Sequence, residues 1–197
     1  MVKIKVGQIT NKISIGRYRV FSKDCVVGAK CWGGCKSLDV YSINDNVDKL
    51  WLFKTLSFDQ IEVCKDIINS GLVNGCRLVL ICDKNNVAHI TWYSVSANSA
   101  VFDSIFSLNI YQETDFGFIG PCLTNREYRG KGLYPLGLST ALSNLGSFGK
   151  KRALISCRES NIPSLRGIAK SGFIPFRTII LVRFLKLNFI YEEKISM

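Results

Sequence analysis

The sequence lacks an apolar run long enough to cross a membrane. The best candidate, residues 173–191, is interrupted by Arg177, Arg183 and Lys186, whereas a spanning helix needs about 20 consecutive apolar residues. Basic residues near the N-terminus are not followed by an apolar stretch, so we expect no secretory signal. Long charged tracts, which would indicate disorder, are also missing. These absences lead us to expect a cytoplasmic globular protein.

Histidine is scarce, because His89 is the only one among 197 residues. Three of the eight cysteines, Cys25, Cys31 and Cys35, lie close together. Their spacing is irregular, and a zinc site would require paired ligands and a fourth group. The other cysteines stand singly in largely apolar surroundings, as small buried hydrophobes do in a reducing compartment. We therefore expect structural thiols and no metal site.

Acidic residues are few relative to basic ones, 15 against 26, and the net charge is +11. Such an excess attracts polyanions, which include nucleic acid, anionic membranes and phosphorylated small molecules. The sequence has no zinc-finger spacing, no basic helix followed by heptads and no aromatic RNA-binding strand. The charge therefore leaves a nucleic-acid-binding protein as the weakest of three functional hypotheses.

The composition is that of an ordinary globular domain, with 47% apolar and 21% charged residues, and the length suffices for one hydrophobic core. Short alternating stretches within residues 1–22 predict strand, whereas residues 23–50 show no clear pattern. A capping box at Ser57 predicts a helix that ends at Gly71 or Gly75.

The rest of the chain alternates between strands and helices. Apolar, β-branched runs predict a hairpin of two strands at residues 77–82 and 87–95. We then expect a strand at residues 116–124, a helix at 132–145, a strand at 152–157, a helix at 163–171 and final strands at 173–187. This alternation predicts an α/β (α+β) fold with a central mixed sheet flanked by helices.

A basic, glycine-containing turn joins the predicted strand 116–124 to the helix after it. The turn reads Arg129-Gly130-Lys131-Gly132. Glycines let successive backbone N–H groups point toward a ligand, and a helix N-terminus adds free N–H groups and partial positive charge. Such a turn suits a pyrophosphate, although by itself it does not differ from an ordinary glycine-assisted helix start.

A second motif surrounds the next helix. Residues from Asn161 to Ser164 open it, and Gly172 and Phe173 close it. Pro163 suits the first turn of a helix and Gly172 suits the position just after its end. The presence of both motifs, in this order, favours an anion-binding turn over an ordinary glycine-assisted helix start.

Together the motifs resemble the cofactor signatures of the GNAT acetyltransferase superfamily. The first signature is Arg or Gln, two residues, Gly, one residue, and Gly or Ala, and Arg129, Gly132 and Tyr134 occupy those positions. The second is Asn, then Ala or Ser three residues later, then Gly-Phe at the helix end, which Asn161 and Ser164 begin. Tyr134 departs from the pattern, because the family has a small residue there.

The resemblance implies a single acyltransferase domain over residues 1–197, with residues 1–112 on the acceptor side and residues 113–187 holding the cofactor. Acetyl-CoA, or another acyl-CoA, would be the co-substrate, and no metal is implied. The strand backbone would meet the pantetheine arm, and the turn would hold the pyrophosphate. The implied contacts are Cys122, Leu123, Thr124, Arg129, Gly130, Lys131, Gly132, Leu133, Tyr134, Asn161 and Ser164.

Proton transfer is the least determined step. The resemblance implies direct attack of a neutral amine on the thioester, which needs a proton acceptor and an oxyanion donor. Many relatives carry an acidic Tyr seven residues after the Asn, where this chain has Ile168. The alternatives are that Tyr134 or a water protonates the leaving thiolate, or that the thiolate departs without an acid. His89 and Glu113 are candidate bases, although a hydrogen-bonded strand histidine and a solvated loop carboxylate are the preferred interpretations.

Three functions are therefore open. An N-acetyltransferase acting on a primary amine is preferred, and the absence of Tyr at position 168 keeps a non-catalytic acyl-CoA-binding or regulatory domain as the alternative. The acceptor side of the chain matches nothing that identifies the amine. An amino sugar or sugar nucleotide is our expectation, because some GNAT relatives acetylate nucleotide-linked sugars and a basic surface would suit such an acceptor. A homodimer is also left open.

Overall fold

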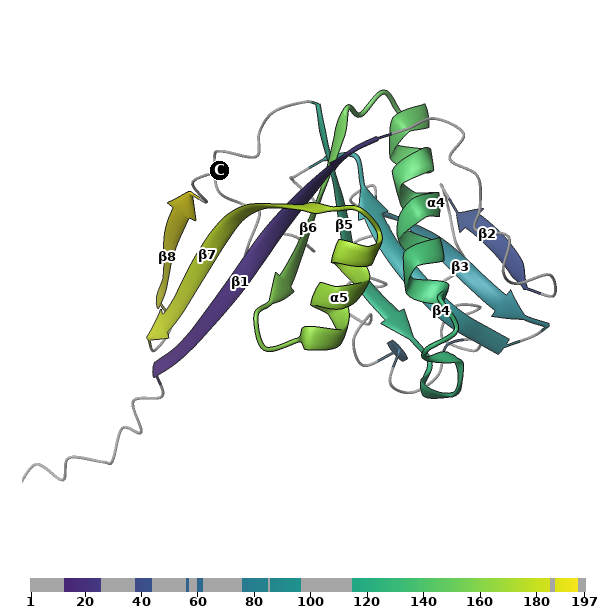
Figure 1. The fold of residues 1–197 in the computed structure, drawn as a ribbon, viewed down its shortest axis with the longest axis horizontal. Coiled ribbons are helices and arrows are strands. Elements are labelled where there is room, and N and C mark those ends of the chain that lie inside the picture. Colours follow the sequence, from purple (N-terminus) through teal and green to yellow (C-terminus); the bar gives the residue numbers. More distant parts are fainter. Residues whose placement is uncertain are drawn as a thin grey trace, which may run out of the picture.

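The computed structural model describes residues 13–25, 38–43, 56, 60–61, 76–84, 86–96, 115–184 and 187–194. Within these residues the chain forms one eight-stranded mixed sheet that carries two helices (Figure 1). The strands are β1 (Ile13–Asp24), β2 (Asp39–Ile43), β3 (Cys76–Asp83), β4 (Asn86–Ser94), β5 (Phe116–Thr124), β6 (Arg152–Arg158), β7 (Ile174–Phe184) and β8 (Leu187–Lys194). The helices are α4 (Leu133–Ser147) and α5 (Ile162–Lys170). The predicted α/β (α+β) fold class is confirmed.

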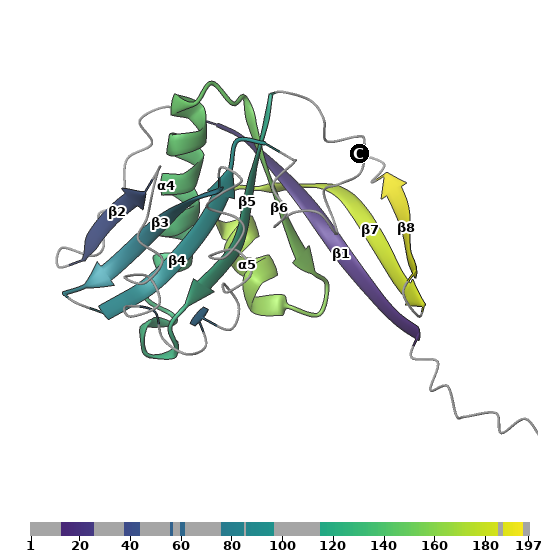
Figure 2. The ribbon, with the colours of Figure 1, turned by 180° about the vertical axis from the view of Figure 1, so that it is seen from behind.

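The strands follow the order β2-β3-β4-β5-β6-β1-β7-β8 across the sheet. Strands β2 to β5 are antiparallel neighbours, whereas β5 and β6 run parallel. Strand β1 is antiparallel to both β6 and β7 and lies between them (Figures 1 and 2). The unit β6-α5-β7 is thus a split βαβ unit, with the N-terminal strand inserted between its two parallel strands.

Apolar side chains pack on both faces of the sheet. The face that carries α4 and α5 buries one core cluster, which includes Leu138, Ala141 and Leu145 of α4. Gly117 of β5 makes room for this helix, because a Cβ there would lie 2.5 Å from a methyl group of Leu145. The opposite face buries a second cluster, to which Trp92 belongs. The central strands β3 and β4 are therefore buried on both faces.

Most element boundaries agree with the sequence-based expectations to within a few residues. Strand β5 has the predicted bounds, and α4 begins and ends within two residues of its predicted ends. Strand β2 lies in the segment 23–50, for which the sequence showed no pattern. Gln60 and Ile61 are helical, but Ser57, Gly71 and Gly75 lie outside the described residues, so that the predicted bounds of this helix remain untested.

Strands β5 and β6 separate partway along their length. Their pairing ends where Ile119 faces Ile155, and the next residue, Gly120, has a φ of +129°. From there β5 follows β4, with which it pairs as far as Thr124. Strand β6 instead follows β1, with which it pairs as far as Arg158. The two strands therefore diverge. The first residues of α4, and helix α5, lie beside the opening.

Candidate functional site

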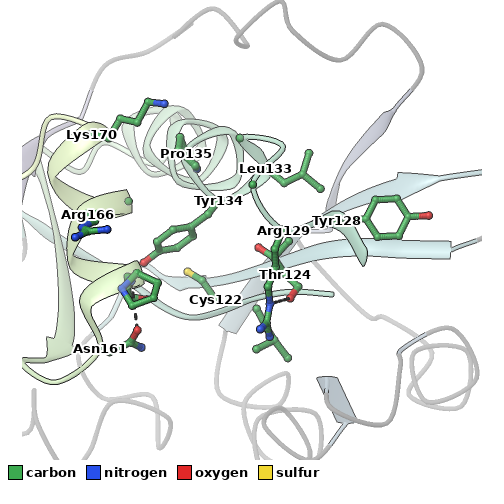
Figure 3. Close-up of a pocket in the computed structure, with 16 residues that line it drawn as sticks. Cys122, Thr124, Tyr128, Arg129, Leu133, Tyr134, Pro135, Asn161, Arg166 and Lys170 are labelled. Carbon is green, nitrogen blue, oxygen red and sulfur yellow. Dashed lines mark hydrogen bonds between the residues drawn. The ribbon is translucent and has the colours of Figure 1, made fainter. Parts of the chain in front are cut away.

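A cleft of about 530 Å³ opens beside the diverging end of β5 (Figure 3). Its walls come from the end of β5, the turn that leads into α4, and α5. The lining residues are Cys122, Leu123, Thr124, Tyr128, Arg129, Gly130, Gly132, Leu133, Tyr134, Pro135, Asn161, Pro163, Ser164, Arg166, Gly167 and Lys170. The two sequence motifs, which are about thirty residues apart in the chain, thus meet around one cavity.

Every residue that the sequence predicted as a cofactor contact lines this cleft, except Lys131. The Lys131 Nζ instead lies 4.7 Å from the centre of the Tyr128 ring, where it makes a cation–π contact. Contact of these residues with a ligand remains a prediction.

The motifs did not predict the basic residues of α5 that line the cleft, Arg166 and Lys170. Their spacing of four residues places both on one side of the helix, together with Pro163. The four-residue spacing of Arg166 and Lys170 is the sequence signal that could have identified them. With Arg129 they give the cleft three cationic side chains among the described residues, and no carboxylate is found among the lining residues in that part of the chain. The cleft therefore suits an anionic ligand.

The turn before α4 has the backbone of an anion-binding site. Gly130 and Gly132 each have a φ of +78°, a conformation that other residues adopt at a cost. The N–H groups of Gly130, Gly132, Leu133 and Tyr134 have no acceptor within the described part of the chain. Free N–H groups at the start of a helix, together with the positive end of the helix dipole, favour a bound anion.

Tyr134 lies between α4 and α5. A Cβ on Gly167 would be 2.4 Å from the Tyr134 ring, so the glycine makes room for it. Cys122 of β5 lies beside the Tyr134 side chain (Figure 3). Burial, reinforced by Cys122 and Cys157, raises the pKa of Tyr134, so the phenol is protonated at neutral pH.

Ile168 stands where the resemblance places an acidic tyrosine. Its side chain is fully buried in the core between α5 and the sheet, and it does not line the cleft. The tyrosines that line the cleft among the described residues are Tyr128 and Tyr134, and the acid role of Tyr134 stays a prediction.

His89 is fully buried on β4. Its Nδ1 lies 2.8 Å from the Thr124 hydroxyl oxygen, and its Nε2 lies 2.7 Å from that of Thr91. Burial lowers the pKa of His89 to about 3. These contacts favour the preferred interpretation, a hydrogen-bonded neutral histidine, over a base. Glu113, the other candidate base, lies outside the described residues.

Asn161 is the N-cap of α5. Its Oδ1 accepts a hydrogen bond of 3.3 Å from the backbone N–H of Ser164, which satisfies one free donor of the helix. No acceptor for its amide nitrogen is found among the described residues. The side chain can therefore cap the helix and donate to a ligand at the same time.

The described residues contain neither a cluster of metal ligands nor a membrane-spanning helix. No group of three or more His, Cys, Asp or Glu side chains is arranged there to hold a metal ion. Cys25, Cys76, Cys82, Cys122 and Cys157 are free thiols, whereas Cys31 and Cys35 lie outside the described ranges. No helix in that part of the chain is long and apolar enough to cross a bilayer.

Neither a protein-family model nor a curated protein matches the sequence, but solved structures share its fold. A glucosamine N-acetyltransferase region of a fungal multi-domain β-N-acetylglucosaminidase has a TM-score of 0.62 at 13% identity, covering 88% of this chain and 21% of that chain. A GCN5-related N-acetyltransferase from Sphaerobacter thermophilus has a TM-score of 0.58 at 11% identity, covering 89% and 53%. A GCN5-related N-acetyltransferase-like protein from Streptococcus suis has a TM-score of 0.56 at 13% identity, covering 89% and 64%.

The chain spans less than two thirds of the length of each of these three structures. Identities this low carry information about the fold and not about the substrate. The structural similarity agrees with the resemblance that the two motifs predicted. The chain has the fold of the GCN5-related N-acetyltransferases.

Proposed function

We propose that the chain binds acetyl-CoA, or another acyl-CoA, in the cleft and transfers the acyl group to a primary amine. The observation that supports this most strongly is the divergence of β5 from β6 beside the glycine turn. It places an extended strand, open along one edge to the cleft, next to a helix N-terminus with free N–H donors. An extended amide-containing arm that ends in a pyrophosphate is complementary to both features.

The cleft residues fit such a ligand in charge and shape. The turn from Gly130 to Tyr134 would hold the pyrophosphate, and Arg129, Arg166 and Lys170 would supply positive charge to its phosphates. The backbone of β5 near Leu123 would align the arm as a neighbouring strand does. The amide nitrogen of Asn161 would donate to one of its carbonyl groups.

The acyl-CoA supplies an activated thioester, and the chain would hold it against an incoming amine. Backbone N–H groups at the end of β5 would stabilise the negative charge that develops on the carbonyl oxygen. When the amine attacks and the carbon–sulfur bond breaks, the thiolate needs a proton. Tyr134 is the proposed donor, because it is protonated and lines the cleft beside Cys122. Glu113 and a water remain candidates for accepting the amine proton.

An amino sugar or a sugar nucleotide is the proposed acceptor. One structural neighbour is a glucosamine N-acetyltransferase region, and the net charge of +11 suits a phosphorylated acceptor. A non-catalytic acyl-CoA-binding domain is the second candidate, because Ile168 places no acid in the cleft. Release of free thiol from acetyl-CoA in the presence of glucosamine or a sugar-nucleotide amine distinguishes the two.

Binding is tested by the thermal shift that CoA produces, since a ligand specific to the folded state stabilises it by mass action. We expect a rise in Tm, and we expect combined Arg166→Gln and Lys170→Gln changes to weaken CoA binding roughly tenfold. Arg152→Gln is the matched control, because it also removes surface charge but lies outside the cleft. No shift at millimolar CoA would refute the proposed function.

The Tyr134→Phe variant tests the acid. It keeps the ring that packs on Gly167 and removes only the hydroxyl. If Tyr134 protonates the thiolate, kcat falls roughly a hundredfold while the Kd for CoA is unchanged. Tyr128→Phe is the matched control, because it removes another phenol hydroxyl from a residue that lines the cleft, one that bonds to Asp83, and its kcat should be unchanged. A near-normal kcat in Tyr134→Phe would assign the residue to packing.

A further inference from the structure

A hydrogen-bonded chain of three side chains runs from the core to the cleft. Thr91 on β4 is fully buried, and its hydroxyl oxygen lies 2.7 Å from Nε2 of His89. Nδ1 of His89 lies 2.8 Å from the hydroxyl oxygen of Thr124. Thr124 lines the cleft at the end of β5. His89 therefore connects a side chain without access to solvent to one that can meet a ligand.

The buried end of this chain determines the direction of its hydrogen bonds. Helix α4 passes directly over it, since a Cβ on Gly137 would be 2.5 Å from both Nε2 of His89 and the oxygen of Thr91. Within the described residues, His89 is the sole side-chain partner of the Thr91 hydroxyl. A buried hydroxyl must donate its proton or pay a desolvation cost. Thr91 consequently donates, and Nε2 of His89 accepts.

The acceptor role of Nε2 sets the state of the rest of the imidazole. Burial lowers the pKa of His89 to about 3, so the ring is neutral and carries one proton. With Nε2 as acceptor, that proton resides on Nδ1 and is donated to the Thr124 oxygen. The Thr124 hydroxyl proton is then not used in the hydrogen bonds among these three side chains, and it is available to the cleft.

We propose that Thr91 and His89 fix the Thr124 hydroxyl as a hydrogen-bond donor to a carbonyl oxygen of the acyl-CoA arm. This inference rests on the proposed function, because it assigns a contact within the same cleft. Thr124 would touch the ligand, whereas His89 and Thr91 are positioning residues. The opposite tautomer would make the Thr124 hydroxyl donate to His89 and would turn its lone pairs toward the carbonyl oxygen, which would repel it.

The tautomer can be measured directly, because the sequence contains a single histidine. Nitrogen-15 NMR of the untagged protein, labelled at histidine, gives one pair of ring resonances. We expect a neutral ring protonated at Nδ1 at pH 7, and the same neutral ring at pH 5.5. A ring protonated at Nε2, or one that titrates near its ordinary pKa, would overturn the inference whether or not CoA binds.

Binding measurements test the contact with the ligand. Thr124→Val should raise the Kd for CoA about three- to tenfold, the effect of losing one neutral hydrogen bond, and Thr124→Ser should restore it. Thr91→Val should also weaken binding and should populate the Nε2-protonated ring, although Thr91 has no access to the cleft. Thr140→Val is the matched control, because this hydroxyl bonds to Leu136 within α4, and its Kd should equal that of the unchanged protein.

The outcomes separate this inference from the proposed function. If CoA has no effect on the unchanged protein, both fail together. If CoA binds the unchanged protein and binds Thr124→Val equally well, the proposed function stands and the inference alone is overturned. If Thr124→Val weakens binding but Thr91→Val changes neither Kd nor tautomer, the orienting role of the buried pair is refuted.

Discussion

Burial controls the protonation of two neighbouring rings, those of His89 and Tyr134. The ring centres of His89 and Tyr134 are 6.0 Å apart. Burial lowers the pKa of His89 and raises the pKa of Tyr134, so both are held in their neutral forms. Tyr134 therefore presents an uncharged hydroxyl to the cleft, whereas the cationic residues of the cleft, Arg129, Arg166 and Lys170, belong to the turn before α4 and to α5.

The buried histidine predicts a stability that depends on pH. The folded state keeps His89 neutral down to a pKa of about 3, whereas the unfolded chain protonates it near 6.5. Between these values the unfolded state binds the extra proton, so stability is complete above pH 6.5 and declines as the pH falls. We expect a loss of about 2 kcal/mol between pH 6.5 and 5, measured by urea unfolding. His89→Gln, which does not titrate, should lose much less over the same interval, and equal slopes for the two proteins would contradict the assignment.

Among the helices and strands, the sequence pattern predicted best those elements whose ends are set by interactions between neighbouring residues. Strand β5 has the predicted bounds, because its apolar run and the glycine turn after it define both ends. Helix α5 begins at the Asn161 cap and the proline after it, which the second motif already indicated. These elements and their order brought the two motifs to one cleft, so most of the lining residues could be predicted from the sequence.

Contacts between distant residues could not be predicted in this way. Val20 of β1 faces Ser156 of β6 and Arg177 of β7, and nothing in the alternation of residues 1–22 identifies these partners. The contact made by Gly137 could not be predicted either. Its sequence signal is only a low helix propensity, yet in the fold it lies against His89. Side-chain partners across the sheet depend on tertiary packing, which a single sequence does not display.

At the scale of the whole molecule, β1 unites the two parts into which the resemblance divided the chain. This strand comes from the proposed acceptor-side half, residues 1–112, but lies between β6 and β7 of the proposed cofactor half. It also contacts the C-terminal end of α5, because Lys23 Nζ donates a 2.7 Å hydrogen bond to the carbonyl oxygen of Ser171, the C-cap of this helix. The wall of the cleft formed by α5 therefore depends on the N-terminal strand.

This arrangement predicts that damage to β1 lowers the stability of the whole fold in one cooperative transition. Val20→Ala removes two methyl groups from a fully buried position and should cost about 1–3 kcal/mol. Ile15→Ala is the matched control on the same strand, because its side chain is 70% exposed and its loss should cost at most about 0.5 kcal/mol. Circular dichroism and the CoA-dependent shift, followed against temperature, should report the same lowered Tm for Val20→Ala. If secondary structure persisted after CoA stabilisation was lost, or if Val20→Ala melted like Ile15→Ala, then β1 would not be integral to the domain that holds the cleft.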